Sequence, residues 1–304
     1  MLEVSLVGTG GMMPMPGRFL ASMLLRLNGK MILVDCGECT QVSLKILGWG
    51  FKSIDAICIT HFHADHISGL PGMLLTIGNA GREEPLTIIG PEGLEYVVEG
   101  LRRIVPELNF PIRFVEFTEK ENSLTFGEYH ISAIPVHHRI KCLAYRFDIK
   151  RQGKFDPERA KALNIPINLW SKIQKNGSAE FEGKVFTQDM VMGEERRGIS
   201  LSYCTDSRPG RDIAEFARES DLFVCEGMYG DEEKLKKAKE YKHMLFSEAA
   251  KMARDAKVGK LWLTHYSPSM NTPEDYVDSA RKIFPKTYLG RDRLTTTLSF
   301  IDEE

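Results

Sequence analysis

The stretch SIDAICITHFHADHISGL, residues 53–70, joins an apolar segment to a dense group of histidines. Three of the eight histidines of the chain, His61, His63 and His66, lie within six residues together with Asp65. The apolar residues before them predict a β-strand, so these polar side chains stand where a strand ends. Chance gives the pattern H-x-H-x-D-H on the order of once in several thousand chains of this length. The pattern therefore indicates a metal site.

The spacing within this stretch predicts two neighbouring cation positions. Residues two apart on an extended chain share a face, so His61 and His63 can offer imidazole nitrogens to one cation. Asp65 and His66 follow where the chain turns, and we expect them to point to an adjacent position. That position suggests a second cation close to the first.

The remaining ligands are expected at the ends of other strands, because one cation needs three or four ligands and two need more. The candidates are His138 after HISAIPVHH, Asp206 after ISLSYCTD and His265 after KLWLTH, each at the carboxyl end of an apolar segment. His137 competes with His138, since strand alternation allows only one of the two to face the site. Together these residues would complete a two-metal site.

Composition bounds the class of protein. The chain has 304 residues and a formal net charge of −2, so its overall charge carries no footprint of a nucleic-acid binder. No apolar run approaches the roughly 20 residues that span a bilayer, and the start MLEVSLVGTG reads as a strand rather than a signal peptide. We expect a cytoplasmic protein without a membrane segment.

Short strand-like runs alternate with helical patterns along most of the chain, which predicts the α/β class. Several predicted strands follow one another without a helix between them, so mixed sheets are expected rather than purely parallel ones. Residues 231–258, DEEKLKKAKEYKHMLFSEAAKMARDAKV, are strongly helical in pattern, and their mixed charges suit a solvated helix face.

A polar and weakly periodic segment, residues 150–197, interrupts this pattern. Its first part, residues 150–175, has seven lysines and arginines against two acidic residues, a balance of +5 in a chain whose total charge is negative. One interpretation is a solvated connection between strands. The other is a projecting arm that meets a polyanion.

The chain resembles the metallo-β-lactamase superfamily, which has H-x-H-x-D-H after a strand and then a lone His, a lone Asp and a C-terminal His at strand ends. Within it, the chain is similar to the ribonuclease Z family, the tRNA 3′-end endonucleases, over nearly its whole length. The similar stretches are VGTGGMMPMPGR, ILVDCGECTQ, ITHFHADHISGLPGML, LTIIGPEGL, PVHHRIKCLAYRF, CTDSRP, KHMLFSEAAKMA and LTHYSP.

This resemblance implies a four-layer αββα fold, with two mixed sheets sandwiched between helices. It implies a single domain over residues 1–304 with an inserted basic arm at about 150–197. It also implies a homodimer and two zinc ions, although His and Asp ligands accept manganese or iron as well.

The resemblance also implies roles for individual residues. His138 lies seven residues before Tyr145, as the third histidine does in the family, which selects it over His137. A hydroxide shared by the two metals would be the nucleophile, because the cations lower the pKa of bound water. The implied assignments place His61, His63 and His138 on one zinc, Asp65, His66 and His265 on the other, and Asp206 on both.

Three further residues carry implied catalytic roles. Asp65 can orient or deprotonate the attacking water as well as bind metal, and His243 matches the histidine that donates a proton to the departing 3′-oxygen. Glu226 matches the acid that holds this histidine. For substrate binding, the candidates are Arg18 near the site and Lys154 and Lys172 in the arm.

Several positions depart from the family pattern. The N-terminal loop usually reads P-x-K-x-R-N, but Pro16 and Phe19 stand where lysine and asparagine are usual. Leu245 replaces a threonine two residues after His243, and Ile167 and Asn168 replace a Gly-Pro pair in the arm. These departures affect substrate preference rather than hydrolysis.

Three functions therefore compete. The first is a zinc-dependent endoribonuclease that cleaves the 3′ trailer from precursor tRNA after the discriminator base. The second is a hydrolase of the same fold that acts on a small ester, such as an arylsulfate or a cyclic phosphodiester. The third is a non-catalytic RNA-binding scaffold that keeps the metal site for stability.

Overall fold

The structure of the chain is a computed structural model that describes residues 1–301. The chain divides into two compact units. The larger comprises residues 1–148 and 200–299, and the smaller comprises residues 149–199 with residues 300 and 301. Each unit has a core of its own, and each is described by itself below.

The first of two seven-stranded sheets contains β1 (Leu2–Gly8), β2 (Ser22–Leu27), β3 (Lys30–Val34), β4 (Ile54–Cys58), β5 (Leu86–Pro91), β6 (Ile112–Phe117) and β16 (Thr295–Leu298). The spatial order of its strands is β16-β1-β2-β3-β4-β5-β6. β1 pairs antiparallel with β16 and β2, and β2 pairs antiparallel with β3, whereas β3 to β6 run parallel. The sheet is therefore mixed.

The second sheet contains β7 (Asn122–Phe126), β8 (Tyr129–Pro135), β9 (Leu143–Arg151), β12 (Arg196–Cys204), β13 (Leu222–Glu226), β14 (Leu261–Thr264) and β15 (Thr287–Leu289). Its strands lie in the order β15-β14-β13-β12-β9-β8-β7. β12 to β15 run parallel, while β7 and β8 form an antiparallel pair. This sheet is mixed as well.

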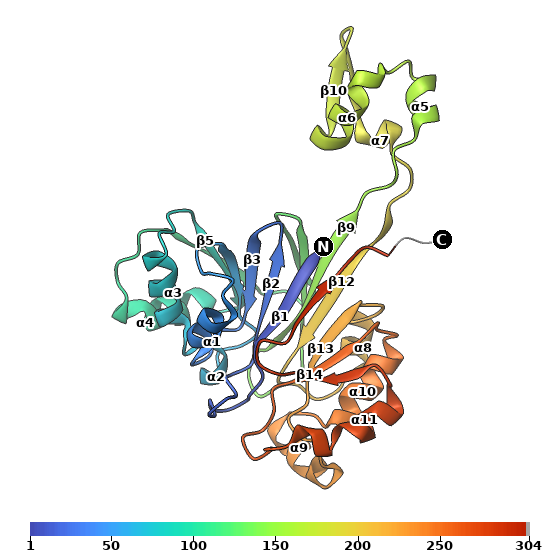
Figure 1. Cartoon of the computed structure of the whole chain (residues 1–304). Coiled ribbons are helices and arrows are strands. Elements are labelled where there is room, and N and C mark those ends of the chain that lie inside the picture. Colours follow the sequence, from blue (N-terminus) through green and yellow to red (C-terminus); the bar gives the residue numbers. More distant parts are fainter. Residues whose placement is uncertain (302–304) are drawn as a thin grey trace. The chain divides into compact units, whose positions relative to one another are not determined.

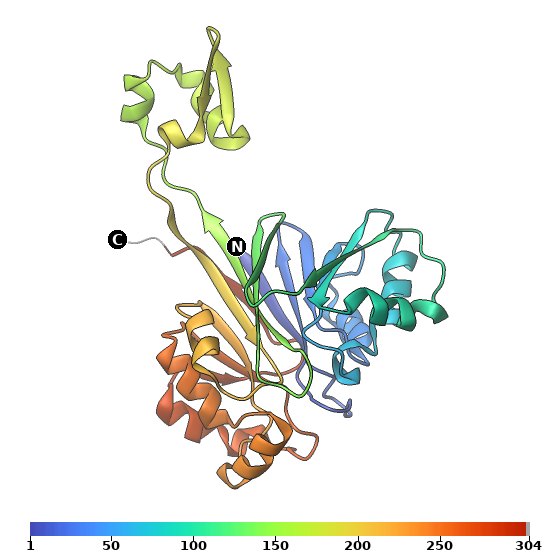
Figure 2. The same ribbon diagram turned by 180° about the vertical axis from the view of Figure 1, so that it is seen from behind.

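Helices cover the outer faces of the two sheets in the larger unit, which confirms the predicted four-layer αββα fold (Figure 1). On the first sheet lie α1 (Thr40–Leu47), α2 (Ala64–Ile67), α3 (Leu70–Asn79), α4 (Leu94–Leu101) and η1 (Arg102–Ile104). On the side of the second sheet lie α8 (Arg211–Phe216), η2 (Glu232–Lys234), α9 (Leu235–Tyr241), α10 (Phe246–Asp255), η3 (Pro273–Asp275) and α11 (Val277–Ile283). The view from behind shows the same separation of the two helical layers (Figure 2).

In the described part of the chain, no helix has both the length and the apolar character needed to cross a membrane.

Each sheet has an apolar core beneath its helices. Residues of β3, β4 and β5 pack there against α1, α3 and α4, and residues of β13 and β14 pack against α10. Parallel strands buried in this way read as nearly continuous apolar runs, which explains the sequences IDAIC and LFVCE. Because the parallel strands of each sheet share a direction, the residues that follow them gather at one edge.

The smaller unit consists of α5 (Pro157–Ala162), α6 (Ile167–Asn176), α7 (Gln188–Val191) and the hairpin of β10 (Ser178–Phe181) and β11 (Lys184–Thr187). Its core contains Ala160, Ile173 and Val191, against which Phe155 and Trp170 pack. Asp156 caps α5 by accepting hydrogen bonds from two backbone N–H groups of its first turn. The weak periodicity of this segment reflects short elements around a small core.

The strongly helical pattern of residues 231–258 corresponds to η2, α9 and α10, but the structure interrupts it between Tyr241 and Phe246. The chain leaves α9 at Lys242, whose φ of 64° is left-handed, and enters α10 only at Phe246. The Arg208 side chain bonds the carbonyl of His243 and pairs with Glu248, and the Glu248 carboxylate accepts a hydrogen bond from the backbone N–H of Leu245. These contacts replace helical hydrogen bonds, so the break is held by tertiary structure.

Candidate active site

The polar residues singled out in the sequence come together at one edge of the two sheets. They follow strands of both sheets, except that Asp65 and His66 lie on the short helix α2 directly after β4. The strand ends and their residues are β4 with His61 and His63, β8 with His138, β12 with Asp206 and β14 with His265.

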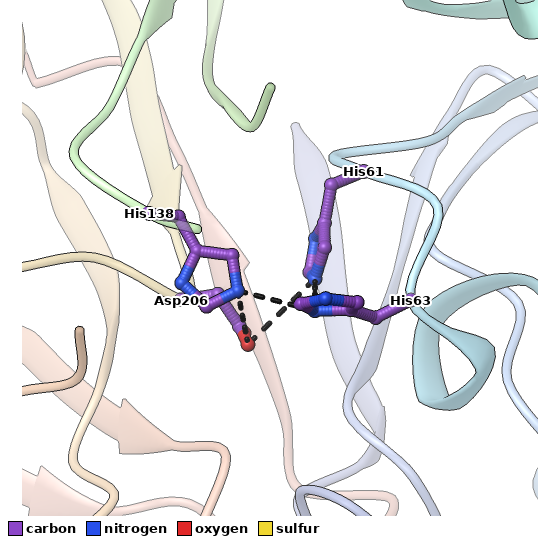
Figure 3. A group of neighbouring side chains, drawn as sticks. All are labelled: His61, His63, His138 and Asp206. Carbon is purple, nitrogen blue, oxygen red and sulfur yellow. Dashed lines mark hydrogen bonds and ion pairs between the residues drawn. The ribbon is translucent and has the colours of Figure 1, made fainter. Parts of the chain in front are cut away.

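The first group consists of His61, His63, His138 and Asp206, whose side chains point toward one another (Figure 3). Nδ1 of His63 lies 3.0 Å from Nε2 of His61 and 3.1 Å from Nε2 of His138. Oδ2 of Asp206 lies 3.7 Å from Nε2 of both His61 and His138. Ligands about 2.0–2.2 Å from a tetrahedral zinc are roughly 3.3–3.6 Å apart, so this spacing fits a single cation.

The second group consists of Asp65, His66 and His265. The Nε2 atoms of the two histidines are 3.2 Å apart, and Oδ2 of Asp65 lies 3.6 Å from that of His66 and 3.5 Å from that of His265. These separations match those of the first group. The three side chains can therefore hold a second cation.

Asp206 contributes one carboxylate oxygen to each group. While Oδ2 faces His61 and His138, Oδ1 lies 3.2 Å from Nε2 of His66 and 3.1 Å from Nε2 of His265. Oδ1 is buried and has no hydrogen-bond partner among the described residues. A buried carboxylate oxygen without a donor is costly, and a cation would satisfy it. The residues present thus fit divalent metal binding, with one oxygen of Asp206 facing each group.

The electrostatics of the site also suit cations. Burial lowers the pKa of His61 and His63, and it lowers that of His138 to about 4, so these rings stay neutral and keep a lone pair for a metal at pH 7. Burial also acts to lower the pKa of His66, but the carboxylates of Asp206 and Asp35 outweigh it and raise that pKa well above its ordinary value. A bound cation would supply the positive charge that these carboxylates otherwise draw onto His66.

Asp35 is a site residue that the sequence reasoning did not single out. It is fully buried after β3, and its carboxylate accepts hydrogen bonds from the N–H and hydroxyl of Thr60 and lies 2.8 Å from Nδ1 of His66. A carboxylate bound to the second ring nitrogen fixes the orientation of a ligating histidine. The signal was available, because Asp35 ends an apolar strand in the same way as Asp206.

The backbone around the site is strained and closely packed. Asp35, Asp206 and His265 all have left-handed φ values, of 58°, 41° and 58°, which non-glycine residues rarely adopt. A side chain at Gly37 would meet the carbonyl oxygen of Asp65, and one at Gly69 would meet that of Gly37. Glycine at these positions lets the loop after β3 pack directly against α2, which carries two of the predicted ligands.

His243 lies beside the first group in the break between α9 and α10. Its Nδ1 is 3.2 Å from Oε2 of Glu226, a fully buried residue, and 3.9 Å from Oδ2 of Asp206. The backbone N–H groups of Ser207 and Met244 also donate to the Glu226 carboxylate, which fixes its position. Burial acts to lower the pKa of His243, but the Glu226 carboxylate raises it to about 9. A ring held in this way can donate a proton at neutral pH.

The structure separates the two neighbouring histidines 137 and 138. His138 turns into the first group, whereas Nε2 of His137 lies 2.9 Å from the ammonium group of Lys242. His137 is exposed. Of this pair, the structure therefore places only His138 with the other candidate ligands.

The N-terminal loop approaches the second group. The backbone N–H of Met12 donates to Oδ2 of Asp65, at 2.7 Å. The guanidinium group of Arg18, a predicted substrate-binding residue, donates to the carbonyls of Met270 and Asn271 and lies 5.5 Å from the ring centre of Tyr266. Arg18 therefore also ties this loop to the residues after β14.

The departures from the family pattern in this loop alter its packing. Phe19 lies where asparagine is usual, and the guanidinium carbon of Arg293 is 5.7 Å from the centre of its ring. The Phe19 backbone N–H donates to Asp292. The other two predicted substrate-binding residues, Lys154 and Lys172, are exposed on the smaller unit.

Comparison with known proteins identifies the family. The chain is 54% identical over 303 residues to a ribonuclease Z of Lachnospira eligens and 55% identical over 304 residues to that of Agathobacter rectalis, with 100% of each chain covered in both cases. The chain belongs to the ribonuclease Z family. A model of the family described as anti-Pycsar protein Apyc1 also matches, over residues 2–104.

Solved structures share the fold at lower identity. The short form of human tRNase Z has a TM-score of 0.72 and 22% identity and covers 98% of this chain and 100% of its own. A metallo-β-lactamase-fold protein of Bacillus subtilis, YhfI, has a TM-score of 0.70 and 18% identity, with 97% and 98% covered. For a ribonuclease Z with this fold, the two groups of His and Asp residues imply a divalent metal. The predicted family and fold are confirmed.

Proposed function

We propose that the chain is an endoribonuclease that removes the 3′ trailer from precursor tRNA by cutting after the discriminator base. The observation that carries this proposal is the Asp206 carboxylate, whose two oxygens face two groups of histidines beside the His243–Glu226 pair. Such a constellation suits hydrolysis of a phosphodiester, and membership of the ribonuclease Z family supplies the substrate.

The metal ligands of the proposal are His61, His63 and His138 for one ion, Asp65, His66 and His265 for the other, and Asp206 for both. We propose zinc, because neutral imidazole and carboxylate ligands at this spacing suit it, although manganese and iron also accept such ligands. When bound, two such ions supply Lewis acidity that activates water and neutralises charge on the reacting phosphate.

Two side chains, Asp65 and His243, would transfer the protons of the reaction. Asp65 accepts a proton from the attacking water, while its position is held by the Met12 backbone N–H. His243 donates a proton to the leaving ribose 3′-oxygen from Nε2, because Nδ1 is engaged by Glu226. Such proton transfer contributes roughly 10²- to 10⁴-fold to the rate. The products are a tRNA with a 3′-hydroxyl and a trailer with a 5′-phosphate.

The proposal is tested by incubating the purified protein with a 3′-extended precursor tRNA and zinc, and by measuring its metal content. Cleavage directly after the discriminator base, with about two metal ions per chain, is the expected result. If the protein hydrolyses a generic phosphodiester or an arylsulfate but leaves precursor tRNA intact, the small-ester function replaces this one. The Asp65→Ala variant tests the scaffold alternative, since a scaffold would keep its function in this variant.

The smaller unit is proposed as the arm that binds tRNA. Within it, Arg159 pairs with Asp156 and Lys161 pairs with Glu158. In the described chain, no carboxylate lies within 4.0 Å of the ammonium groups of Lys154, Lys172 and Lys175, which leaves them available for phosphates. We expect Lys154→Ala/Lys172→Ala to weaken cleavage of precursor tRNA more than hydrolysis of a small phosphodiester.

We also propose that the protein forms a homodimer. Large apolar side chains are exposed on adjacent helices of the first sheet, namely Val42 and Ile46 on α1 and Leu75 on α3. Ile46 is 60% exposed, and a second copy of the chain could cover this surface. Sedimentation of the protein should give the mass of a dimer, and Ile46→Glu should shift it to the monomer.

A further inference from the structure

Three cationic side chains and one tyrosine lie on the two segments that carry His138 and His243, and they have no part in the proposed chemistry. They are Arg139, in the loop after β8, Lys237 and Tyr241 on α9, and Lys242 directly after α9. We call these four residues the basic rim. The loop residue next to Arg139 is the predicted ligand His138, and the residue after Lys242 is His243, so the rim adjoins the site through both segments.

Tyr241 contacts two of these cations. The guanidinium carbon of Arg139 lies 4.8 Å from the centre of the Tyr241 ring, and the ammonium nitrogen of Lys237 lies between two rings, 5.9 Å from that of Tyr241 and 5.7 Å from that of Tyr229. These distances are within the range of cation–π attraction. Arg139 also donates a hydrogen bond to the carbonyl of Glu240, so its side chain is fixed at two points.

Lys242 connects the rim to the site. Its left-handed backbone ends α9, and its ammonium group lies 2.9 Å from Nε2 of His137. Its carbonyl oxygen is 3.5 Å from Nδ1 of His138. An imidazole side chain carries no negative charge, so this contact does not neutralise the ammonium group of Lys242.

The charged groups of the rim form no ion pair with a carboxylate of the described residues. In residues 1–301, no carboxylate lies within 4.0 Å of the charged groups of Arg139, Lys237 and Lys242, whereas the neighbouring Lys141 is paired with Glu92. The segment 234–242 has five lysines and one acidic residue, Glu240. The helical pattern alone suited a solvated face, but the structure places Lys242 in contact with His137 and its carbonyl oxygen next to the ring of His138.

We propose that the basic rim binds the phosphates of the RNA strand immediately 5′ of the bond that is cut, with Tyr241 as a positioning residue. This inference rests on the proposed function. The leaving 3′-oxygen belongs to the mature tRNA, and His243, its proposed proton donor, directly follows Lys242. The nucleotides at the 3′ end of the mature tRNA must therefore lie on the side of the site that the rim borders, and a phosphate backbone is the polyanion they present.

The test compares the double variant Arg139→Ala/Lys237→Ala with a matched control, Lys52→Ala/Arg113→Ala. Lys52 and Arg113 are exposed and lie at the amino ends of β4 and β6, away from the edge that carries the site. Both variants lose one lysine and one arginine. The control therefore corrects for the change in net charge.

The measurement is the dissociation constant of each holoprotein for a mature tRNA that ends at the discriminator base, over a range of salt concentrations. Each lost phosphate contact should reduce the slope of log affinity against log salt by about 0.7–0.9, so the rim variant should lose roughly 1.5 units of slope and about tenfold in affinity. The control should keep the wild-type slope. A 5′-phosphorylated trailer oligonucleotide should lose less affinity than the tRNA.

Tyr241 is tested with Tyr241→Ala and Tyr241→Phe. The alanine variant should reduce the salt slope and raise KM for precursor tRNA more than it changes kcat, because Arg139 loses its ring partner and Lys237 keeps only that of Tyr229. The phenylalanine variant keeps the ring and should restore both values. A purely structural role would lower the melting temperature without changing the slope.

The possible results distinguish failure of the proposed function from failure of the basic-rim proposal. If the wild-type protein does not cleave precursor tRNA, the proposed function fails. If it does cleave, but the rim variant and the control have the same salt slope, the rim does not bind the RNA and this inference is wrong. Equal losses of affinity for tRNA and for the trailer oligonucleotide would also overturn it, because the rim would then not be specific to the 5′ side.

Discussion

The carboxylate of Glu226 holds the ring of His243 at Nδ1, with 3.2 Å between that nitrogen and Oε2. Glu226 ends β13, whereas His243 lies in the short break between two helices, so the pair joins the second sheet to its helical layer. Two backbone N–H groups hold the carboxylate in turn. The arrangement leaves Nε2 as the nitrogen that can reach a substrate.

If His243 donates the proton, the loss of rate in a His243 variant should depend on the leaving group of the substrate. His243→Ala should lower kcat for precursor tRNA by roughly 10²-fold or more, because an alkoxide is a poor leaving group without a proton. The same variant should lose much less with bis(p-nitrophenyl) phosphate, whose phenolate leaves without one. The two rates are measured on one preparation with its metal content determined. Equal losses on both substrates would instead assign His243 to the metal site.

The position of Asp206 predicts a change in metal content. In Asp206→Asn, one charged oxygen becomes an amide nitrogen, so the two groups of histidines can no longer share a carboxylate. We expect the bound metal to fall from about two ions per chain to one or fewer, with a loss of hydrolysis on every substrate. Asp255→Asn, an exposed aspartate on α10, is the control and should keep two ions. A variant that keeps two ions would exclude a bridging role.

Substitution of Asp35 should lower metal affinity although Asp35 is not a proposed ligand. Asp35→Asn removes the charge that orients His66 but keeps an oxygen that can accept a hydrogen bond from Thr60. Loss of such a partner typically lowers metal affinity by roughly 10- to 100-fold. Competition with a coloured chelator measures this change, and Asp35→Ala should lose more affinity. Unchanged affinity in both variants would show that His66 needs no such support.

Retention of metal should depend on pH in a direction set by the histidines. A depressed pKa means that a ring stays unprotonated below the ordinary histidine range, so protons compete with the metal only at lower pH. The pKa of about 4 for His138 places that competition well below pH 6. We expect the group of His61, His63 and His138 to keep its metal during dialysis at pH 6 and to release it as the pH approaches 4, whereas the raised pKa of His66 lets protons compete for the second group at higher pH. Loss of most metal already at pH 6 would contradict this expectation.

Local sequence patterns predicted much of the fold and part of the site. The apolar run before His61 predicts a buried strand, and the spacing of the next histidines places several side chains at its end, because both depend only on the local geometry of the chain. The class of mixed α/β sheets followed in the same way from alternating patterns. The similar stretches around these residues then indicated the family, which the relatives confirmed.

Other features depended on residues far apart in the chain. Nothing local in sequence shows that Asp35 supports His66, or that a helical pattern breaks at Lys242, because Arg208 and Glu248 hold that break across the fold. Local patterns also could not show where the lysines of α9 would lie. The roles of individual site residues stay predictions until the variants above are measured.

The sequence by itself determined which residue types stand at the strand ends, since periodicity and spacing are local properties of the chain. Only the tertiary structure decided that Asp206 turns one oxygen toward each group of histidines, and that Arg139 and Lys237 meet around Tyr241 beside the site. Such relationships arise from the packing of two sheets and their helices, which brings together segments separated by more than 100 residues.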